Sequence, residues 1–295
     1  MENKIYHETN DRRYYMGCIR DPKHADAPRL LTLKQAELLP ASYIISDPTG
    51  IEDQGSLGSC TANAGDNVSK IRSAVATGTY FNGSRLALYK WARDHDGDSG
   101  DVGSSLSSMA WVLANVGVPP ESAWPYNINQ FDVEPPQSVK EAASKDVTTK
   151  ETRLDASNQS VTLSNIKAAI APNAVLPPCY PVMFGFDVPE SFFNTGSSGN
   201  MPAPSGGIAG GHANVFIGYD DNHSGNYDGS KGALYVKNSW GTGWGANGLW
   251  WMPYSFFDNT SYEVGDCWAV ITESDFPNNP PVSAVQFAST PSITL

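Results

Sequence analysis

The sequence is poor in basic residues and has no long hydrophobic run. Its 19 lysines and arginines stand against 31 acidic residues, a formal net charge of −12, and no run of Lys or Arg reverses this balance locally. Because nucleic-acid binding needs a basic surface, no nucleic-acid partner is expected. No stretch approaches the roughly 18 to 20 apolar residues that a membrane-spanning helix needs, so no membrane partner is expected either.

Cysteine is scarce as well, with four residues in the chain: Cys18, Cys60, Cys179 and Cys267. That number is too small for a disulfide scaffold, and if one cysteine is catalytic, at most one disulfide accompanies it. The first residues are polar and lack the apolar region of a signal peptide. We expect either a secreted protein whose signal peptide is absent from this sequence or a cytoplasmic one.

What the chain does have is enough apolar material for a large core. Its 295 residues are 40% hydrophobic and 17% charged, which is ordinary for a globular protein. Residues 1–38 are charged and rich in turn formers, and residues 277–295 are rich in Ser and Thr. We therefore expect an N-terminal extension over 1–38, a folded part over 39–276 and a C-terminal tail over 277–295.

Helical patterns dominate the folded part from about residue 50 to 126. A helix is expected from Cys60 to a stop at Gly78, because apolar residues recur every three or four positions between them. A second is expected over 84–91, and a third between a cap at Ser104 and a stop at Gly117. Short helices are expected at 32–39 and 166–171. These elements predict a mostly helical lobe.

Strand-like runs follow between about 160 and 275, separated by spacers rich in Gly, Ser and Asn. Their succession predicts a second lobe built on an antiparallel sheet or partial barrel, and hence an α+β fold. The polar residues 127–160 are expected to cross between the lobes on the surface. The expected strands are Val182–Phe186, Ala213–Tyr219, Ala233–Lys237, Leu249–Met252 and Trp268–Ile271.

Cys60 stands where a glycine-rich turn runs into a helix. The free N–H groups and the positive end of the helix dipole favour thiolate over thiol at such a position. Gln54 is close enough in sequence for its amide to donate to a substrate oxygen, as one half of an oxyanion hole. The alternative is a cysteine that simply packs in the core, as most lone cysteines do.

A base for this nucleophile is offered by His212, which follows Gly210 and Gly211 and opens an apolar run. The other histidines lie in polar, loop-like surroundings. Asn238 follows another strand and precedes Trp240 in a glycine-dense turn. We expect its amide to hold the imidazole of His212 by a hydrogen bond, and Trp240 to shield that bond from water.

The acidic loop around Asp94, Asp96 and Asp98 invites a comparison with calcium-binding loops. Ser99 stands where such a loop needs glycine and Ser105 where it needs glutamate, which favours a solvated loop over a metal site. No metal and no cofactor are expected.

The motifs around Cys60, His212 and Asn238, in their order along the chain, resemble those of the papain-like cysteine peptidases, whose triad is Cys-His-Asn. The resemblance covers about residues 39 to 272, and Ser84–Tyr89 is similar to the microbial branch in particular. It implies a two-lobed papain-like fold, with a helical left lobe, an antiparallel sheet or partial barrel as right lobe, and the active site between them. The motifs are Asp53-Gln54-Gly55, Gly58-Ser59-Cys60, Gly210-Gly211-His212-Ala213 and Lys237-Asn238-Ser239-Trp240-Gly241.

The resemblance also implies a reaction. Cys60 would attack a peptide carbonyl and form a thioester, with His212 as acid and base and Asn238 as its orienter. Protein or peptide substrates, cleavage as an endopeptidase and a monomeric state are implied. Two alternatives stay open: amide transfer or deamidation on the same pair, and a silent protein that only binds. Further residues implied to take part are Gln54 as oxyanion donor, and Trp240, Gly210, Gly211 and Ser59 in substrate binding or shielding.

Two departures from the family pattern lie beside the nucleophile. Leu57 replaces the family's disulfide cysteine, and Thr61 replaces its aromatic residue. The segment before the folded part is also short for the family's prosegment. Its aromatic-rich stretch, Tyr14–Ile19, is expected to reach the cleft and restrict access to it.

Overall fold

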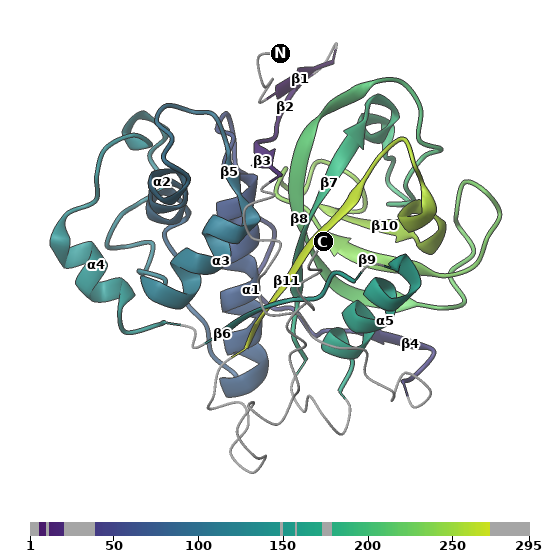
Figure 1. Ribbon diagram of the computed structural model, residues 1–295, viewed down its shortest axis with the longest axis horizontal. Helices are drawn as coiled ribbons and strands as arrows, with labels where there is room; N and C mark the ends of the chain where they lie inside the picture. The colour runs from purple at the N-terminus through teal and green to yellow at the C-terminus, as the bar shows by residue number, and fades with distance from the viewer. Residues whose placement is uncertain are drawn as a thin grey trace, which may run out of the picture.

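The computed structural model describes residues 6–9, 12–20, 39–147, 150–156, 158–172 and 179–271. Figure 1 shows two lobes side by side, helices on the left and a sheet with one helix on the right. The expected α+β class with an antiparallel sheet is thereby confirmed. The expected helix at 32–39, apart from Leu39, and the tail at 277–295 lie outside the described residues.

The left lobe is built on α1 (Cys60–Thr77), α2 (Arg85–Asp96) and α3 (Leu106–Asn115). Helix α1 begins and ends where its pattern predicts, and Gly78 closes it with φ 74° and an N–H bond to the Ala74 carbonyl. Helix α2 runs further than expected, to a left-handed Gly97. The sequence pattern ends at Trp91 because the last turn of α2 is polar and carries no apolar stripe.

The cap of α3 differs by one residue from the expectation. Ser105, not Ser104, accepts the capping hydrogen bond from the Ser108 N–H, and the helix ends before Gly117. Ser104 instead belongs to strand β5 (Ser104–Ser105). Both serines are chemically suited to cap a helix, and Asp96 selects the second by accepting bonds from the Ser105 N–H and hydroxyl.

The right lobe is a seven-stranded sheet with the path β10-β9-β8-β7-β11-β6. Strand β4 (Ser42–Ile44) pairs with β8 off this path, and α5 (Gln159–Ile170) packs on the sheet. Every pairing in the sheet is antiparallel. The strands that the sequence predicts appear, most of them longer, as β7 (Val182–Pro189), β8 (Ile208–Asp220), β9 (Ala233–Lys237), β10 (Leu249–Pro253) and β11 (Val264–Ile271).

The stretch 127–160 is more structured than a surface crossing. It contains the 3-10 turn Ile128–Gln130, helix α4 (Gln137–Ala143) and strand β6 (Lys150–Arg153). Strand β6 pairs with β11, so this stretch contributes an edge to the sheet. Its four residues show no alternation of apolar and polar side chains. They form a strand because they pair with β11.

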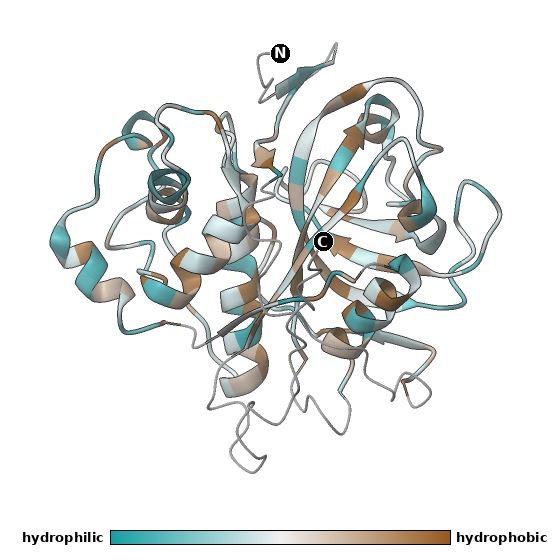
Figure 2. Cartoon of the chain, viewed as in Figure 1, coloured by the Kyte–Doolittle hydropathy of each residue, from teal (hydrophilic) through white to brown (hydrophobic). Residues whose placement is uncertain are grey.

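One apolar core extends through both lobes. Buried side chains of α1, such as Val68 and Ile71, belong to the same cluster as Phe184 and Phe216 of the sheet. Figure 2 shows hydrophobic stretches along the strands and helices, separated by hydrophilic ones. Among the described residues, no helix is long and apolar enough to cross a membrane.

The described part of the N-terminal extension, residues 6–9 and 12–20, lies at the junction of the two lobes. Strands β1 (Tyr6–Glu8) and β2 (Arg13–Tyr15) form a small ribbon, and β3 (Cys18–Ile19) pairs parallel with β5. Figure 1 shows these strands at the top, with β3 between the lobes. A short extended peptide therefore occupies the junction at which the left-lobe helix α1 begins.

Candidate active site

Cys60 is the first residue of α1, and its side chain is completely buried. The loop before it is tied to the right lobe through Gln54. The Gln54 amide donates to the Leu57 carbonyl oxygen at 2.9 Å, and its Oε1 accepts from the Ser239 hydroxyl at 2.7 Å. Gln54 is thus fixed beside the turn that leads into Cys60, with its donor end toward that turn.

His212 lies on β8 and Asn238 follows β9, so two neighbouring strands bring them together. His212 Nε2 is 2.8 Å from Asn238 Oδ1. That oxygen also accepts from the Ser239 backbone N–H at 2.8 Å and from Asn214 Nδ2 at 2.9 Å. Because a backbone N–H can only donate, Asn238 Oδ1 is fixed as an acceptor and His212 Nε2 must carry a proton.

The other ring nitrogen of His212 is then the free base. In a neutral imidazole with the proton on Nε2, Nδ1 is an acceptor. Among the described residues, His212 Nδ1 has no hydrogen-bond partner. The ring is therefore in the tautomer that can take a proton from a thiol or an attacking water.

Trp240 covers the His212–Asn238 pair. Its ring stacks on the His212 ring, with centroids 4.5 Å apart and planes 18° apart. A stacked indole keeps water from the hydrogen bond between imidazole and amide, which strengthens that bond. The indole N–H is in turn bonded to the Tyr15 carbonyl of the N-terminal segment at 2.9 Å.

Burial shifts the pKa values of Cys60 and His212 away from the charged forms. Burial raises the pKa of Cys60 to about 12, although the Ala213 and Thr61 N–H groups pull in the opposite direction. Burial likewise lowers the pKa of His212 to about 4. Both shifts favour the uncharged forms, which is opposite to the direction expected for a thiol at a helix start. Desolvation of the charge outweighs the N–H groups of the helix.

The segment 12–20 lies between the residues next to Cys60 and those next to His212. The Gly17 N–H donates to the Gly211 carbonyl at 3.1 Å, and the Ser104 N–H donates to the Gly17 carbonyl at 2.9 Å. Gly17 has φ +139°, and a Cβ there would lie 2.2 Å from the Gly58 oxygen. Only glycine fits this position, between the turn before Cys60 and the strand of His212.

The remaining expected residues divide into two groups. Gly211 lies directly against the segment, since a Cβ there would lie 2.2 Å from the Cys18 oxygen. Gly210 pairs with Val188 within the β7–β8 ladder. Ser59 is completely buried, and its hydroxyl lies 2.6 Å from the Tyr126 hydroxyl. A role for Ser59 in binding or shielding substrate stays a prediction.

Asn214 is a site residue that the motifs do not reveal. It fixes the acceptor end of Asn238 and is itself held by Trp250 Nε1, 2.9 Å from its Oδ1. A signal for it exists in the sequence. Residues two apart on a strand share a face, so a polar residue two positions after His212 within an apolar run points to the same side as the imidazole.

The cysteines form no disulfide with one another. All four cysteines are free thiols. Within the described ranges, no group of three or more His, Cys, Asp or Glu is placed to hold a metal ion. In the acidic loop, Asp96 is engaged with Ser105, and Asp94 forms an ion pair with Lys90.

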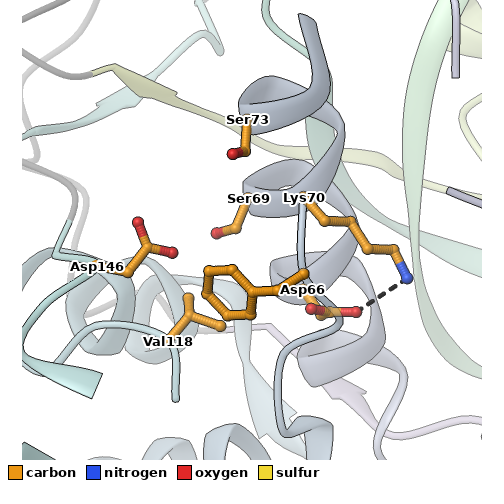
Figure 3. Close-up of a pocket in the computed structure, with 7 residues that line it drawn as sticks. Asp66, Ser69, Lys70, Ser73, Val118 and Asp146 are labelled. Atoms are coloured by element: carbon orange, nitrogen blue, oxygen red, sulfur yellow. Dashed lines mark ion pairs between the residues drawn. The ribbon is translucent and has the colours of Figure 1, made fainter. Parts of the chain in front are cut away.

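Figure 3 shows a hollow beside α1, in which Lys70 and Asp66 form an ion pair. Lys70 Nζ lies 3.0 Å from Asp66 Oδ2 and also pairs with Glu52, which in turn lies 2.8 Å from Arg85. Burial raises the pKa of Asp66, and the two carboxylates together raise that of Lys70 despite its burial. Glu52 precedes Gln54 by two residues, so this network anchors the segment that carries Gln54.

A buried cysteine at a helix start, a base held by an amide and a side-chain amide beside the turn define a thiol-dependent hydrolase on a two-lobed fold. A family model described as papain family cysteine protease matches residues 45–269. The chain belongs to this family, and it is a cysteine protease.

Individual relatives agree with this assignment. A peptidase C1-like protein of Acanthamoeba polyphaga mimivirus is 31% identical over 239 residues, which cover 76% of this chain and 70% of the viral one. Mouse pro-cathepsin H is 25% identical over 204 residues, which cover 67% of this chain and 54% of that relative. The crystal structure of xylellain, a cysteine protease from Xylella fastidiosa, is similar with a TM-score of 0.73 and 27% identity, over 87% of this chain and 96% of xylellain.

Proposed function

We propose that the protein is an endopeptidase that cleaves proteins or peptides through an acyl thioester on Cys60. The observation that carries the proposal is the free Nδ1 of His212, whose tautomer is fixed by the three bonds to Asn238 Oδ1. A base fixed in this way, with a cysteine at the start of α1, supplies the two groups that thiol catalysis needs.

The steps follow from these groups. His212 Nδ1 takes the Cys60 proton, and the thiolate attacks the peptide carbonyl carbon. The oxyanion is stabilised by the Gln54 side-chain amide and the Cys60 backbone N–H. His212 then protonates the leaving amine as the C–N bond breaks and the thioester remains. Water, deprotonated by His212, hydrolyses the thioester and restores the thiol.

Gln54→Ala is expected to lower kcat by about 10²-fold, because one preorganised donor to the oxyanion is lost. KM is expected to change little, since the donor acts on charge that develops only in the transition state. Steady-state kinetics on a fluorogenic peptide measure both parameters. A variant that loses affinity for the peptide but keeps kcat would contradict the role given to Gln54.

The segment 12–20 completes the proposal as an intramolecular cover of the cleft. Met16 is fully buried, and the segment binds both the strand of His212 and strand β5. A peptide substrate needs the same space, so substrate and segment compete. The folded part, about residues 39–276, would act as a monomer, and its acidic, cysteine-poor composition suits a secreted enzyme.

Amide transfer or deamidation would use the same two groups, so only the reaction product distinguishes them from peptide cleavage. Incubation with an unfolded protein is expected to release new N-termini, detected by amine labelling and mass spectrometry, without free ammonia in equal amount. Ammonia release with an intact backbone would establish deamidation instead. If a folded chain whose cover has been displaced gave neither product, that result would establish a protein that only binds.

A further inference from the structure

We propose that Asp101 and Tyr89 are positioning residues that hold the turn before Cys60 at a set distance from the strand on which a peptide binds. The inference rests on the proposed peptidase function. It concerns the place where this chain departs from its family, since Leu57 stands where relatives have a disulfide cysteine and all four cysteines are free. The turn before Cys60 and residues 101–104 flank the cleft on the left lobe. Another contact, here called the tie, must hold these two segments together.

The tie is a chain of three hydrogen bonds. Asp101 Oδ1 accepts from the Gly58 N–H at 2.9 Å and from the Tyr89 hydroxyl at 2.6 Å. The Tyr89 oxygen accepts from the Gly103 N–H at 3.0 Å. Tyr89 is fully buried, and burial raises the pKa of its hydroxyl, which therefore stays protonated and keeps donating to Asp101. Gly58 and Gly103 are thus joined through two side chains.

A second contact joins the same segments on the other side of the nucleophile. The Thr61 and Ser104 hydroxyls are hydrogen-bonded to each other, and both side chains are fully buried. Thr61 is the residue that replaces the family's aromatic side chain. Residues on both sides of Cys60, Gly58 in the turn and Thr61 in α1, are therefore bonded to residues 101–104 by polar contacts.

Residues 103 and 104 form the part of the cleft that holds an extended chain. In the structure the Ser104 N–H binds the Gly17 carbonyl, and β5 pairs with β3. A peptide that replaced the N-terminal segment would meet the same N–H group. The Asp101–Tyr89 tie consequently sets the position of the bound backbone relative to Cys60. A misplacement of about 1 Å at such a point can cost about 10²-fold in rate.

Asp101 also carries a charge that the thiol senses. Burial is the main reason for the raised pKa of Cys60, and the Asp101 carboxylate adds to it. The effect of Asp101 on the position of the turn can therefore be separated from the effect of its charge on the thiol. An asparagine keeps an oxygen acceptor for Gly58 and Tyr89 but removes the negative charge, whereas an alanine removes both.

The experiment compares variants of the full chain that also carry Gly17→Ala, which prevents the N-terminal segment from competing. Asp101→Ala is expected to lower kcat about 30-fold. Asp101→Asn is expected to restore kcat to within about threefold and to move the acidic limb of kcat/KM to lower pH, because thiolate forms more readily without the neighbouring charge. Tyr89→Phe is expected to raise KM about tenfold with a smaller change in kcat, since it releases Gly103 and leaves Gly58 bound.

The matched control is Asp98→Asn, which removes the same charge from an exposed side chain of the same loop. It is expected to change neither kcat nor the pH limb. Amide hydrogen exchange at Gly58 in the chain with its native Gly17 gives a second measurement, and Asp101→Ala is expected to accelerate it at least about tenfold.

The outcomes distinguish a failure of the Asp101–Tyr89 inference from a failure of the proposed peptidase function. An active parent chain in which Asp101→Ala keeps full kcat and Gly58 exchange is unchanged would overturn the inference and leave the peptidase function standing. Loss of kcat in Asp101→Ala without rescue by Asp101→Asn, and with no shift in the pH limb, would also overturn it, since that pattern indicates a general structural defect. A parent chain without peptidase activity would remove the proposed function and this inference together.

Discussion

Cys60→Ala is expected to lower kcat/KM for peptide cleavage by at least about 10⁴-fold. The thiol is the only group in the proposed mechanism that forms a bond to the substrate, and loss of a nucleophile from a catalytic unit has effects of this order. The fold should survive, because alanine removes one sulfur atom from a completely buried site. Cleavage of a fluorogenic peptide and of an unfolded protein measures the effect, with circular dichroism as the test of folding.

Cys179→Ala provides a matched control for this result. Cys179 is also a buried free thiol, and its sulfur lies 2.9 Å from the Tyr43 hydroxyl, at strand β4. The same chemical change there is expected to leave activity within about twofold, since surface and structural changes away from a site usually have small effects. If Cys60→Ala retained wild-type cleavage, the thioester mechanism would be wrong whatever the family assignment.

Gly17→Ala is expected to raise the activity of the full chain on small peptides by about 10³-fold. The added Cβ would lie 2.2 Å from the Gly58 oxygen, which belongs to backbone that cannot move aside cheaply. The segment can then no longer bury Met16 and form its bonds to Gly211 and Ser104. Burial of one such side chain contributes about 1.5 to 3 kcal/mol and each hydrogen bond about 1 kcal/mol, and about 1.4 kcal/mol corresponds to a factor of ten.

The same substitution should change the titration of the site. With the segment in place, burial holds the pKa of Cys60 at about 12 and that of His212 at about 4. Access of water removes much of the desolvation, so the pKa of the thiol falls and that of the imidazole rises. A lower thiol pKa means more thiolate at neutral pH. Alkylation of Cys60 between pH 6 and 8 should therefore be much faster in Gly17→Ala than in the wild-type chain.

Gly78→Ala serves as the control for backbone strain. Gly78 also has a positive φ, of +74°, but an added Cβ there meets no atom within 4 Å. The substitution is expected to cost about 1 kcal/mol of stability and to leave activity unchanged. Deletion of residues 1–37 should act in the same direction as Gly17→Ala. Unchanged activity in both, with the chains folded, would show that the segment is not a cover.

Local signals in the sequence account for much of this structure. The α1 helix is predicted in full because its apolar spacing and Gly78 are local features, and β9 (Ala233–Lys237) because its apolar run has clear turn-rich borders. The groups of the candidate site are predictable for a similar reason. Each stands in a short motif, at the start of a helix or beside a strand, whose chemistry can be recognised without knowledge of the partner.

What escapes the sequence depends on contacts between distant segments. Strand β6 is charged and becomes a strand only through β11. The cap of α3 is decided between two serines by Asp96. The raised pKa of Cys60 follows from its burial in the folded chain, which no local rule anticipates. Asp101 appears as one of several loop carboxylates until its bond to Gly58 is seen.

Trapping of the acyl-enzyme would show whether hydrolysis passes through a thioester on Cys60. The Gly17→Ala chain would be mixed with a peptide ester at mildly acidic pH, quenched in acid, digested and examined by mass spectrometry. We expect the acyl mass on the fragment that contains Cys60, and its loss when the enzyme is returned to neutral buffer before quenching. An acyl group on another residue, or turnover of the ester that persists undiminished in Cys60→Ala, would contradict it.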